Sequence, residues 1–166
     1  LPNGYPLERK MMPIAQAIGE KNLTLLELVP RRGMSFDVGE KVYIGEGKRD
    51  KVYYILGRLQ REKLTETAKQ HLENVIARIV KEREQEFVEF FNKAEAINKR
   101  VHQLELLPGL GKKYTKEILA QREIGKFESF EDIKKRIPNL PFPEKTIEKR
   151  ILLELSEFER YNLFTK

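Results

Sequence analysis

Two glycines and two lysines lie together in the run Pro-Gly-Leu-Gly-Lys-Lys at residues 108–113, a combination that can bind an anion through backbone amides. The proline ends the preceding helix, because its ring removes an amide donor and clashes with the previous turn. Gly109 and Gly111 can adopt positive φ and leave no side chain between backbone and ligand, while Leu110 is expected to point inward as an anchor. Helical spacing resumes over residues 114–122, so the unpaired amides of the new first turn carry partial positive charge. The segment predicts an anion site.

Residues 107–119 resemble the helix-hairpin-helix motif, with which many DNA- and RNA-binding proteins hold a phosphodiester backbone without reading sequence. Tyr114 and Thr115 stand where that motif more often has a small residue and a hydroxyl, so looser helix packing is expected there. The alternative is an ordinary helical hairpin, but such a turn rarely needs a second glycine followed by two lysines. The resemblance implies that the loop containing Leu110 contacts phosphate through Gly109, Gly111 and Lys112, followed by Lys113 and Lys116.

A second, degenerate copy of the hairpin is predicted over residues 127–155. Ser129 is an expected N-cap with Asp132 three residues later, and the next helix is expected to start near Pro143. The intervening turn, residues 137–143, has three prolines and no glycine. It offers fewer amides, so we expect it to serve packing more than phosphate contact.

The amino-terminal third has the pattern of short strands, predicted at residues 13–19, 23–29, 41–44 and 52–56. They predict a small curled barrel or sheet of about four or five strands. In the third strand Tyr43 is expected on the outer face, where an aromatic ring suits stacking of a single-stranded base; the alternative is an ordinary strand tyrosine whose ring covers the end of the barrel.

Basic residues cluster in the turns between these strands. They are expected on one rim of the barrel, where they could bind phosphate; the alternative is ordinary solvated loop charge. The candidate binding residues there are Arg31, Arg32, Lys48, Arg49 and Lys51.

A helical connector joins the two basic parts. Thr65 is a plausible N-cap, and apolar residues recur at helical spacing from Leu72 to Ala94, which indicates a core-facing stripe. The aromatic end of the stripe, residues 87–91, could alternatively bind a partner. We expect a connector with a bend, and a change of direction over residues 92–97.

Charge and composition agree with a polyanion partner. The chain of 166 residues has a net charge of +6, and residues 99–122 alone hold six Lys or Arg against two Asp or Glu. The absence of cysteine favours a reducing cytoplasm, and neither a membrane helix nor a signal peptide is recognisable. Because the chain begins with Leu, we expect residues upstream of Leu1, with room for a first strand that the numbered chain lacks.

No catalytic pattern is recognisable. His71 and His102 lie about thirty positions apart without metal-ligand spacing, and we expect both on helix faces. Asp132 could serve as the carboxylate of a DNA glycosylase, but its role as a capping partner explains it better. We therefore expect no enzyme activity, no metal and no cofactor.

Nearly the whole chain resembles an archaeal family of uncharacterised proteins, expected to bind RNA, that join an S1/OB-like β domain to a tandem helix-hairpin-helix domain. The strings that carry the resemblance are residues 23–30, 42–45, 49–52, 88–92 and 102–109. The resemblance implies a two-domain α+β fold, with an S1/OB-like barrel or sheet at residues 1–61, connector helices at 62–98 and an all-α tandem helix-hairpin-helix (SAM-like) domain at 99–166.

The expected function is non-enzymatic, largely sequence-independent binding of nucleic acid, with RNA favoured over DNA and no membrane partner. Two alternatives remain open at this point. One is a protein-protein scaffold within a ribonucleoprotein or DNA-repair assembly, and the other is a DNA-binding accessory protein. The sequence does not predict an oligomeric state.

Overall fold

The computed structural model describes residues 13–156 and 159–166. Residues 1–12 of the predicted β domain, and any strand before them, lie outside this range. The chain divides into two compact units, one ending at His71 and also including Lys166, the other spanning Leu72–Thr165. Each unit has its own buried apolar residues.

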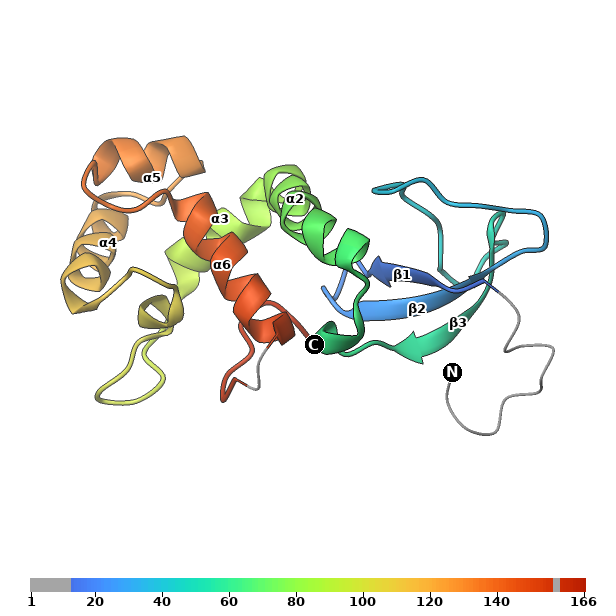
Figure 1. The fold of residues 1–166 in the computed structure, drawn as a ribbon. Helices are drawn as coiled ribbons and strands as arrows, with labels where there is room; N and C mark the ends of the chain where they lie inside the picture. The colour runs from blue at the N-terminus through green and yellow to red at the C-terminus, as the bar shows by residue number, and fades with distance from the viewer. Residues whose placement is uncertain (1–12, 157–158) are drawn as a thin grey trace. The chain divides into compact units, whose positions relative to one another are not determined.

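The first unit is built on a three-stranded antiparallel sheet in the order β1-β2-β3 (Figure 1). The strands are β1 (Ala15–Ile18), β2 (Leu25–Pro30) and β3 (Val52–Arg58), which confirms three of the four predicted strands. The fully buried residues Leu28 and Val52 come from the two paired strands β2 and β3. A short 3-10 helix, η1 (Arg61–Lys63), follows the sheet.

The predicted fold class, an S1/OB-like barrel paired with an all-α tandem helix-hairpin-helix (SAM-like) domain, is wrong. The chain is α+β, but its sheet is open and three-stranded, and residues 41–44 form no strand. Those residues lie in the long loop between β2 and β3, whose first backbone bond runs from Arg31 N to Lys51 O at 2.7 Å. The outer edges of β1 and β3 remain unpaired in this sheet, and residues 41–44 add to neither of them.

The connector folds as two helices, α2 (Glu66–Glu82) and α3 (Glu84–Lys93). The Thr65 hydroxyl accepts the Ala68 amide at 3.1 Å, as expected of an N-cap. At Arg83 the backbone leaves helical geometry (φ −106°, ψ 32°), so the predicted bend falls between the two helices.

The rest of the second unit consists of η2 (Gln103–Leu106), α4 (Lys112–Ile124), α5 (Phe130–Arg136) and α6 (Pro143–Ser156). Ser129 caps α5 by accepting the Asp132 amide at 2.9 Å, and α6 begins at Pro143, both as predicted. Asn92 in α3 bonds both the amide and the carbonyl of Phe127, at 2.7 and 3.0 Å, and so links α3 to the segment between α4 and α5.

A buried ion pair on α6 connects the segments of this unit. Arg150 Nε donates to Glu154 Oε2 at 2.9 Å, and the two side chains are 5% and 0% exposed. The Arg150 guanidinium also donates to the carbonyls of Leu106 and Tyr161. The Glu154 carboxylate accepts the amides of residues 163–165, each at 3.0 Å. One residue pair thus joins α6 to the end of η2 and to the carboxyl-terminal segment.

Glu154→Gln is expected to destabilise the protein by about 3–5 kcal/mol, because it removes the buried counter-charge of Arg150 and leaves only Glu159, 3.8 Å from the guanidinium. Urea titration followed by circular dichroism gives the free energy of unfolding. The control is Lys93→Gln, which removes the exposed partner of Glu89 and is expected to cost less than about 1 kcal/mol. Equal losses in the two variants would contradict the structural role of the buried pair.

Candidate functional site

The glycine hairpin, residues 108–111, is a tight loop held in place by buried leucines on either side of Gly109. It joins η2 to α4, and the buried side chains of Leu107 and Leu110 are 1% and 3% exposed. The Leu110 amide bonds the Leu107 carbonyl at 3.0 Å. Gly109 has φ +89°, a conformation that strains other residues, and a Cβ there would lie 3.5 Å from Pro141 Cγ. The helix predicted before Pro108 is only the single 3-10 turn of η2.

The loop and the first turn of α4 present backbone amides without partners. Thr115 N is the first to bond, to the carbonyl of the N-cap Gly111 at 3.0 Å. A Cβ at Gly111 would meet nothing within 4 Å, so this end of the helix is open. Among the described residues, none accepts a hydrogen bond from the amides of Gly109, Gly111, Lys112, Lys113 and Tyr114.

The first turn of α4 differs in charge from those of the other α-helices. The first turns of α2, α3, α5 and α6 each contain an acidic residue, whereas that of α4 contains none and has Lys112 and Lys113 instead. A cation at the positive end of a helix dipole is unfavourable by typically about 0.3–1 kcal/mol. A bound anion would reverse that sign, so the arrangement favours an anion site.

The three predicted lysines of the hairpin are not equivalent. Lys112 Nζ donates to the Arg100 carbonyl at 2.7 Å and pairs with Glu105 at 3.2 Å, although its side chain is 73% exposed. Lys113 and Lys116 are exposed and form no ion pair with any residue in the described ranges. The structure therefore makes Lys113 and Lys116 more available to a ligand than Lys112, an order that the sequence did not predict.

A capping box orients η2 ahead of the hairpin. His102 Nδ1 accepts the Leu104 amide at 3.1 Å, and Glu105 accepts the His102 amide at 2.8 Å. That amide bond is the main cause of the lowered pKa of Glu105, and the bond from Lys112 adds to it. Burial lowers the pKa of His102, helped by the positive charge of Arg122. His102 thus caps η2, whereas the sequence predicted it only as a residue on a helix face.

Two residues that depart from the motif hold the start of α4 in place. Tyr114 Oη donates to the Asn139 carbonyl at 3.0 Å, and the buried Thr115 hydroxyl donates to the Gly111 carbonyl at 3.0 Å. Both side chains thus bond to backbone carbonyls, one across to the second turn and one within the start of α4.

The basic residues around the second turn serve structure. Lys134 Nζ donates to the Leu140 carbonyl and lies 4.7 Å from the centre of the Phe142 ring. Arg136 donates to the Gly125 carbonyl at 2.8 Å. Lys134 thus bonds the backbone of the second turn and Arg136 that of the end of α4, in line with a packing role.

The other predicted residues belong to the first unit. Arg31, Arg49, Lys51 and Tyr43 are linked through backbone or side-chain bonds within the β2–β3 loop. Arg32 and Lys48 are exposed in the same loop. Tyr43 is 59% exposed but lies in this loop and not on a sheet face, which corrects its predicted position.

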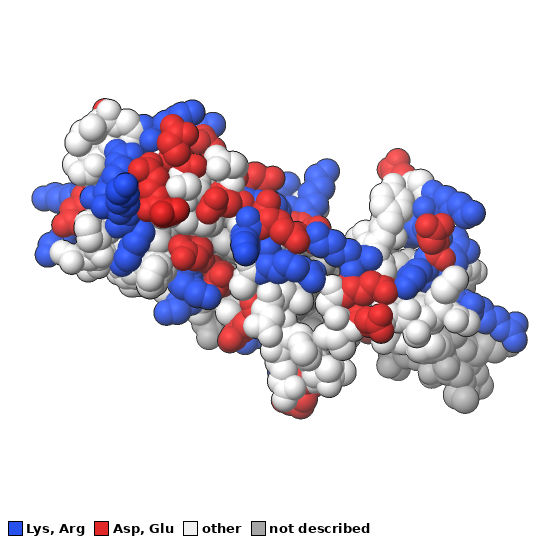
Figure 2. Space-filling model, turned by 90° about the horizontal axis from the view of Figure 1, so that it is seen from above, with Lys and Arg blue, Asp and Glu red and all other residues white. Residues whose placement is uncertain are grey.

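Figure 2 shows Lys and Arg side chains interspersed with Asp and Glu over the face that it draws. No broad surface of one sign covers that face.

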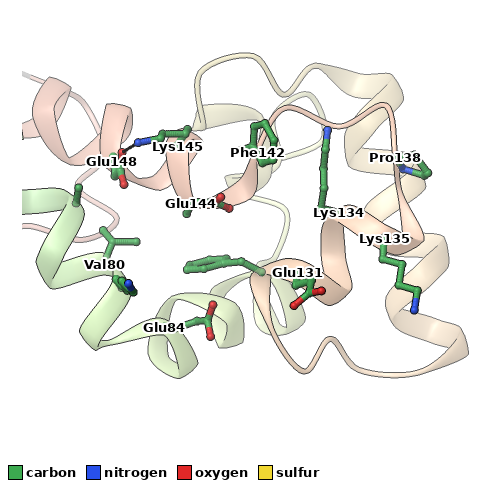
Figure 3. A pocket seen from close by; sticks show the side chains of 13 residues that line it. Val80, Glu84, Glu131, Lys134, Lys135, Pro138, Phe142, Glu144, Lys145 and Glu148 are labelled. Atoms are coloured by element: carbon green, nitrogen blue, oxygen red, sulfur yellow. Dashed lines mark ion pairs between the residues drawn. The ribbon is translucent and has the colours of Figure 1, made fainter.

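The second unit also has an open groove of about 880 Å³, lined by residues of α2, α3, α5, α6 and the second turn. Its apolar lining includes Val80, Phe130 and Phe142 (Figure 3). Acidic and basic side chains surround it, and Lys145 pairs with Glu148 at its edge at 3.2 Å. The groove could not be predicted from the sequence, because it depends on how segments distant in sequence pack together.

Two absences hold within the described ranges. No three His, Asp or Glu side chains gather there as a metal would require. No helix there is both long and apolar enough to cross a membrane.

Comparison with known proteins gives three matches. The family model described as "Protein of unknown function (DUF655)" matches residues 1–166. An uncharacterized protein of Methanocaldococcus jannaschii is 44% identical over 168 residues, which covers all of this chain and 76% of that protein. A crystal structure of an Archaeoglobus fulgidus protein, also assigned to DUF655, matches with a TM-score of 0.88 and 45% identity over 100% of this chain and 93% of that one.

His102→Asn is expected to reduce the loss of stability on acidification. Because the fold lowers the pKa of His102, the neutral imidazole stabilises the protein fully above about pH 6.5, and this contribution is lost as the pH falls toward the folded pKa. Asparagine can accept the same amide bond without titrating. The measurement is the urea midpoint at about pH 7.5 and about pH 5, on either side of the unfolded pKa. An equal drop in variant and wild type would contradict this role of His102.

Proposed function

We propose that this chain, which belongs to the DUF655 family of uncharacterised archaeal proteins, binds nucleic acid through the backbone amides at the start of α4. The proposed role is binding without catalysis and without a cofactor. Contact with the phosphate backbone makes this binding largely independent of sequence, since phosphate contacts position a polymer but do not read its bases.

The amides without partners carry this proposal. Five of them, over residues 109–114, lie at the positive end of a helix of 13 residues whose first turn holds lysines and no acid. Phosphate oxygens are suitable acceptors for such a group of amides. Lys113 and Lys116 supply positive charge that no described acidic residue neutralises. The local resemblance of residues 107–119 to the helix-hairpin-helix motif supports the same reading.

RNA is the favoured polymer. The preference rests on the family resemblance, because amides and lysines at phosphates do not sense the 2′-hydroxyl. A DNA-binding accessory role would use the same contacts, and parallel titrations with RNA and DNA of one sequence separate the two.

A protein scaffold is the second candidate, and the groove of Figure 3 is the observation that favours it. Its lining includes Phe142, whose side chain is 56% exposed, and large exposed aromatic residues are common where proteins meet. A partner held in this groove would depend far less on salt than a polyanion.

Affinity for nucleic acid is expected to fall steeply with salt. Contact with about three to six phosphates gives a slope of about −2 to −5 for log affinity against log salt. Lys113→Gln with Lys116→Gln should make the slope shallower by about 1 to 2, measured by fluorescence anisotropy of labelled RNA and DNA. The control is Lys81→Gln with Lys149→Gln, two exposed lysines of the same unit. Identical slopes for wild type and both double variants would exclude the lysines from the interface.

Gly111→Val is expected to weaken binding by more than about tenfold while the fold survives, because its side chain would cover the open amides. The matched control is Gly125→Val, at the other end of α4, where a Cβ also meets nothing within 4 Å. Unfolding midpoints verify that both variants fold. Equal affinity of the two variants would contradict amide binding at the start of α4.

A further inference from the structure

We propose that the β2–β3 loop binds single-stranded nucleic acid, with Tyr43 stacking on a base and Arg31 and Arg49 holding the adjacent phosphate. This inference rests on the proposed function and extends it, because it names the form of the substrate. It concerns the first unit alone.

The side chains of Arg31 and Arg49 are each held by a hydrogen bond from Nε to a backbone carbonyl. Arg31 Nε donates to the Arg49 carbonyl at 2.7 Å, and Arg49 Nε donates to the Gly45 carbonyl at 2.9 Å. The terminal nitrogens of both guanidinium groups make no hydrogen bond to the described parts of the chain. Each arginine therefore presents donors in a fork that suits phosphate, and part of the ordering entropy is already lost before binding.

The basic residues of this loop, which also include the exposed Arg32 and Lys48, differ in whether an acidic side chain pairs with them. Lys51 also lies here, but its ammonium pairs with Glu40 at 2.8 Å. Neither Arg31 nor Arg49 forms an ion pair with an acidic residue of the described ranges. Arg31 Nε and Arg49 Nε bond to two carbonyls of the same loop, those of Arg49 and Gly45, so a phosphate bound at this turn would be attracted to both guanidinium charges.

Tyr43 is held against the same turn. Its hydroxyl accepts the Gly47 amide at 3.2 Å. The ring lies so close to Gly45 that a Cβ there would be 2.3 Å from Tyr43 Oη, so only glycine permits this contact. More than half of the side chain, 59%, still remains exposed. The Tyr43 ring and the Arg49 side chain thus both contact Gly45, which places the exposed ring close to Arg49.

Stacking on the Tyr43 ring requires a base whose face is not already covered by a neighbouring base. A tyrosine ring is worth about 1–3 kcal/mol per stacked base, and a duplex keeps its base faces covered. The Tyr43 ring should therefore add affinity for single strands and none for a duplex, whereas the two arginines can contact the phosphates of either form. No base-specific contact follows from the geometry, so the preference is for form and not for sequence.

The test compares Tyr43→Leu with wild type on three labelled probes: a short single-stranded RNA, the same backbone with abasic sites, and the matching duplex. The variant should bind the single strand about 5- to 150-fold more weakly, which corresponds to about 1–3 kcal/mol, and bind the other two probes within about twofold of wild type. Gly45→Ala should show the same pattern, because its methyl group displaces the ring.

The matched control is Tyr53→Leu, which removes a tyrosine of the same unit that is 57% exposed and whose ring contacts Tyr54. Unchanged single-strand binding in Tyr43→Leu, or an equal loss on all three probes, would overturn the stacking role. If wild type binds none of the three probes, the proposed function itself fails. If wild type binds and only the Tyr43 effect is missing, this inference alone fails.

Discussion

The buried pair of Arg150 and Glu154 is the interaction on which the candidate site depends. Two charges removed from water are costly unless nearly every donor and acceptor finds a partner, and here backbone groups satisfy most of them. The guanidinium bonds the Leu106 carbonyl directly before the hairpin. The pair thus fixes the end of η2 against α6, and the glycine loop starts from that fixed point.

A loop fixed in this way can leave its amides unsatisfied. Leu107 and Leu110 are buried, Tyr114 bonds the second turn, and Gly109 takes a left-handed conformation, so the backbone has little freedom to turn its amides inward. The unfavourable interaction of lysines with the positive end of α4 is small compared with the stabilisation from the buried apolar core. The site is therefore preorganised for an anion, and it lacks within the described chain the acceptor that would complete it.

Sequence patterns predicted the elements whose causes are local. The proline-glycine turn, the Ser129 cap and the start of α6 all follow from neighbours in sequence. The strand predicted at residues 41–44 was wrong because apolar alternation does not reveal whether a segment pairs with a neighbouring strand. Long-range outcomes were equally hidden, among them the pairing of Lys112 with Glu105, the apolar groove and the burial of an i,i+4 ion pair that is usually exposed.

The most direct test is to observe the amides themselves. In a ¹⁵N-resolved NMR titration with a short RNA, we predict that the largest amide shifts fall on residues 109–114 and saturate with the affinity measured by anisotropy. High salt should reverse them. Binding with undisturbed amides at residues 109–114, and with shifts confined to the groove or to α6, would contradict the central claim.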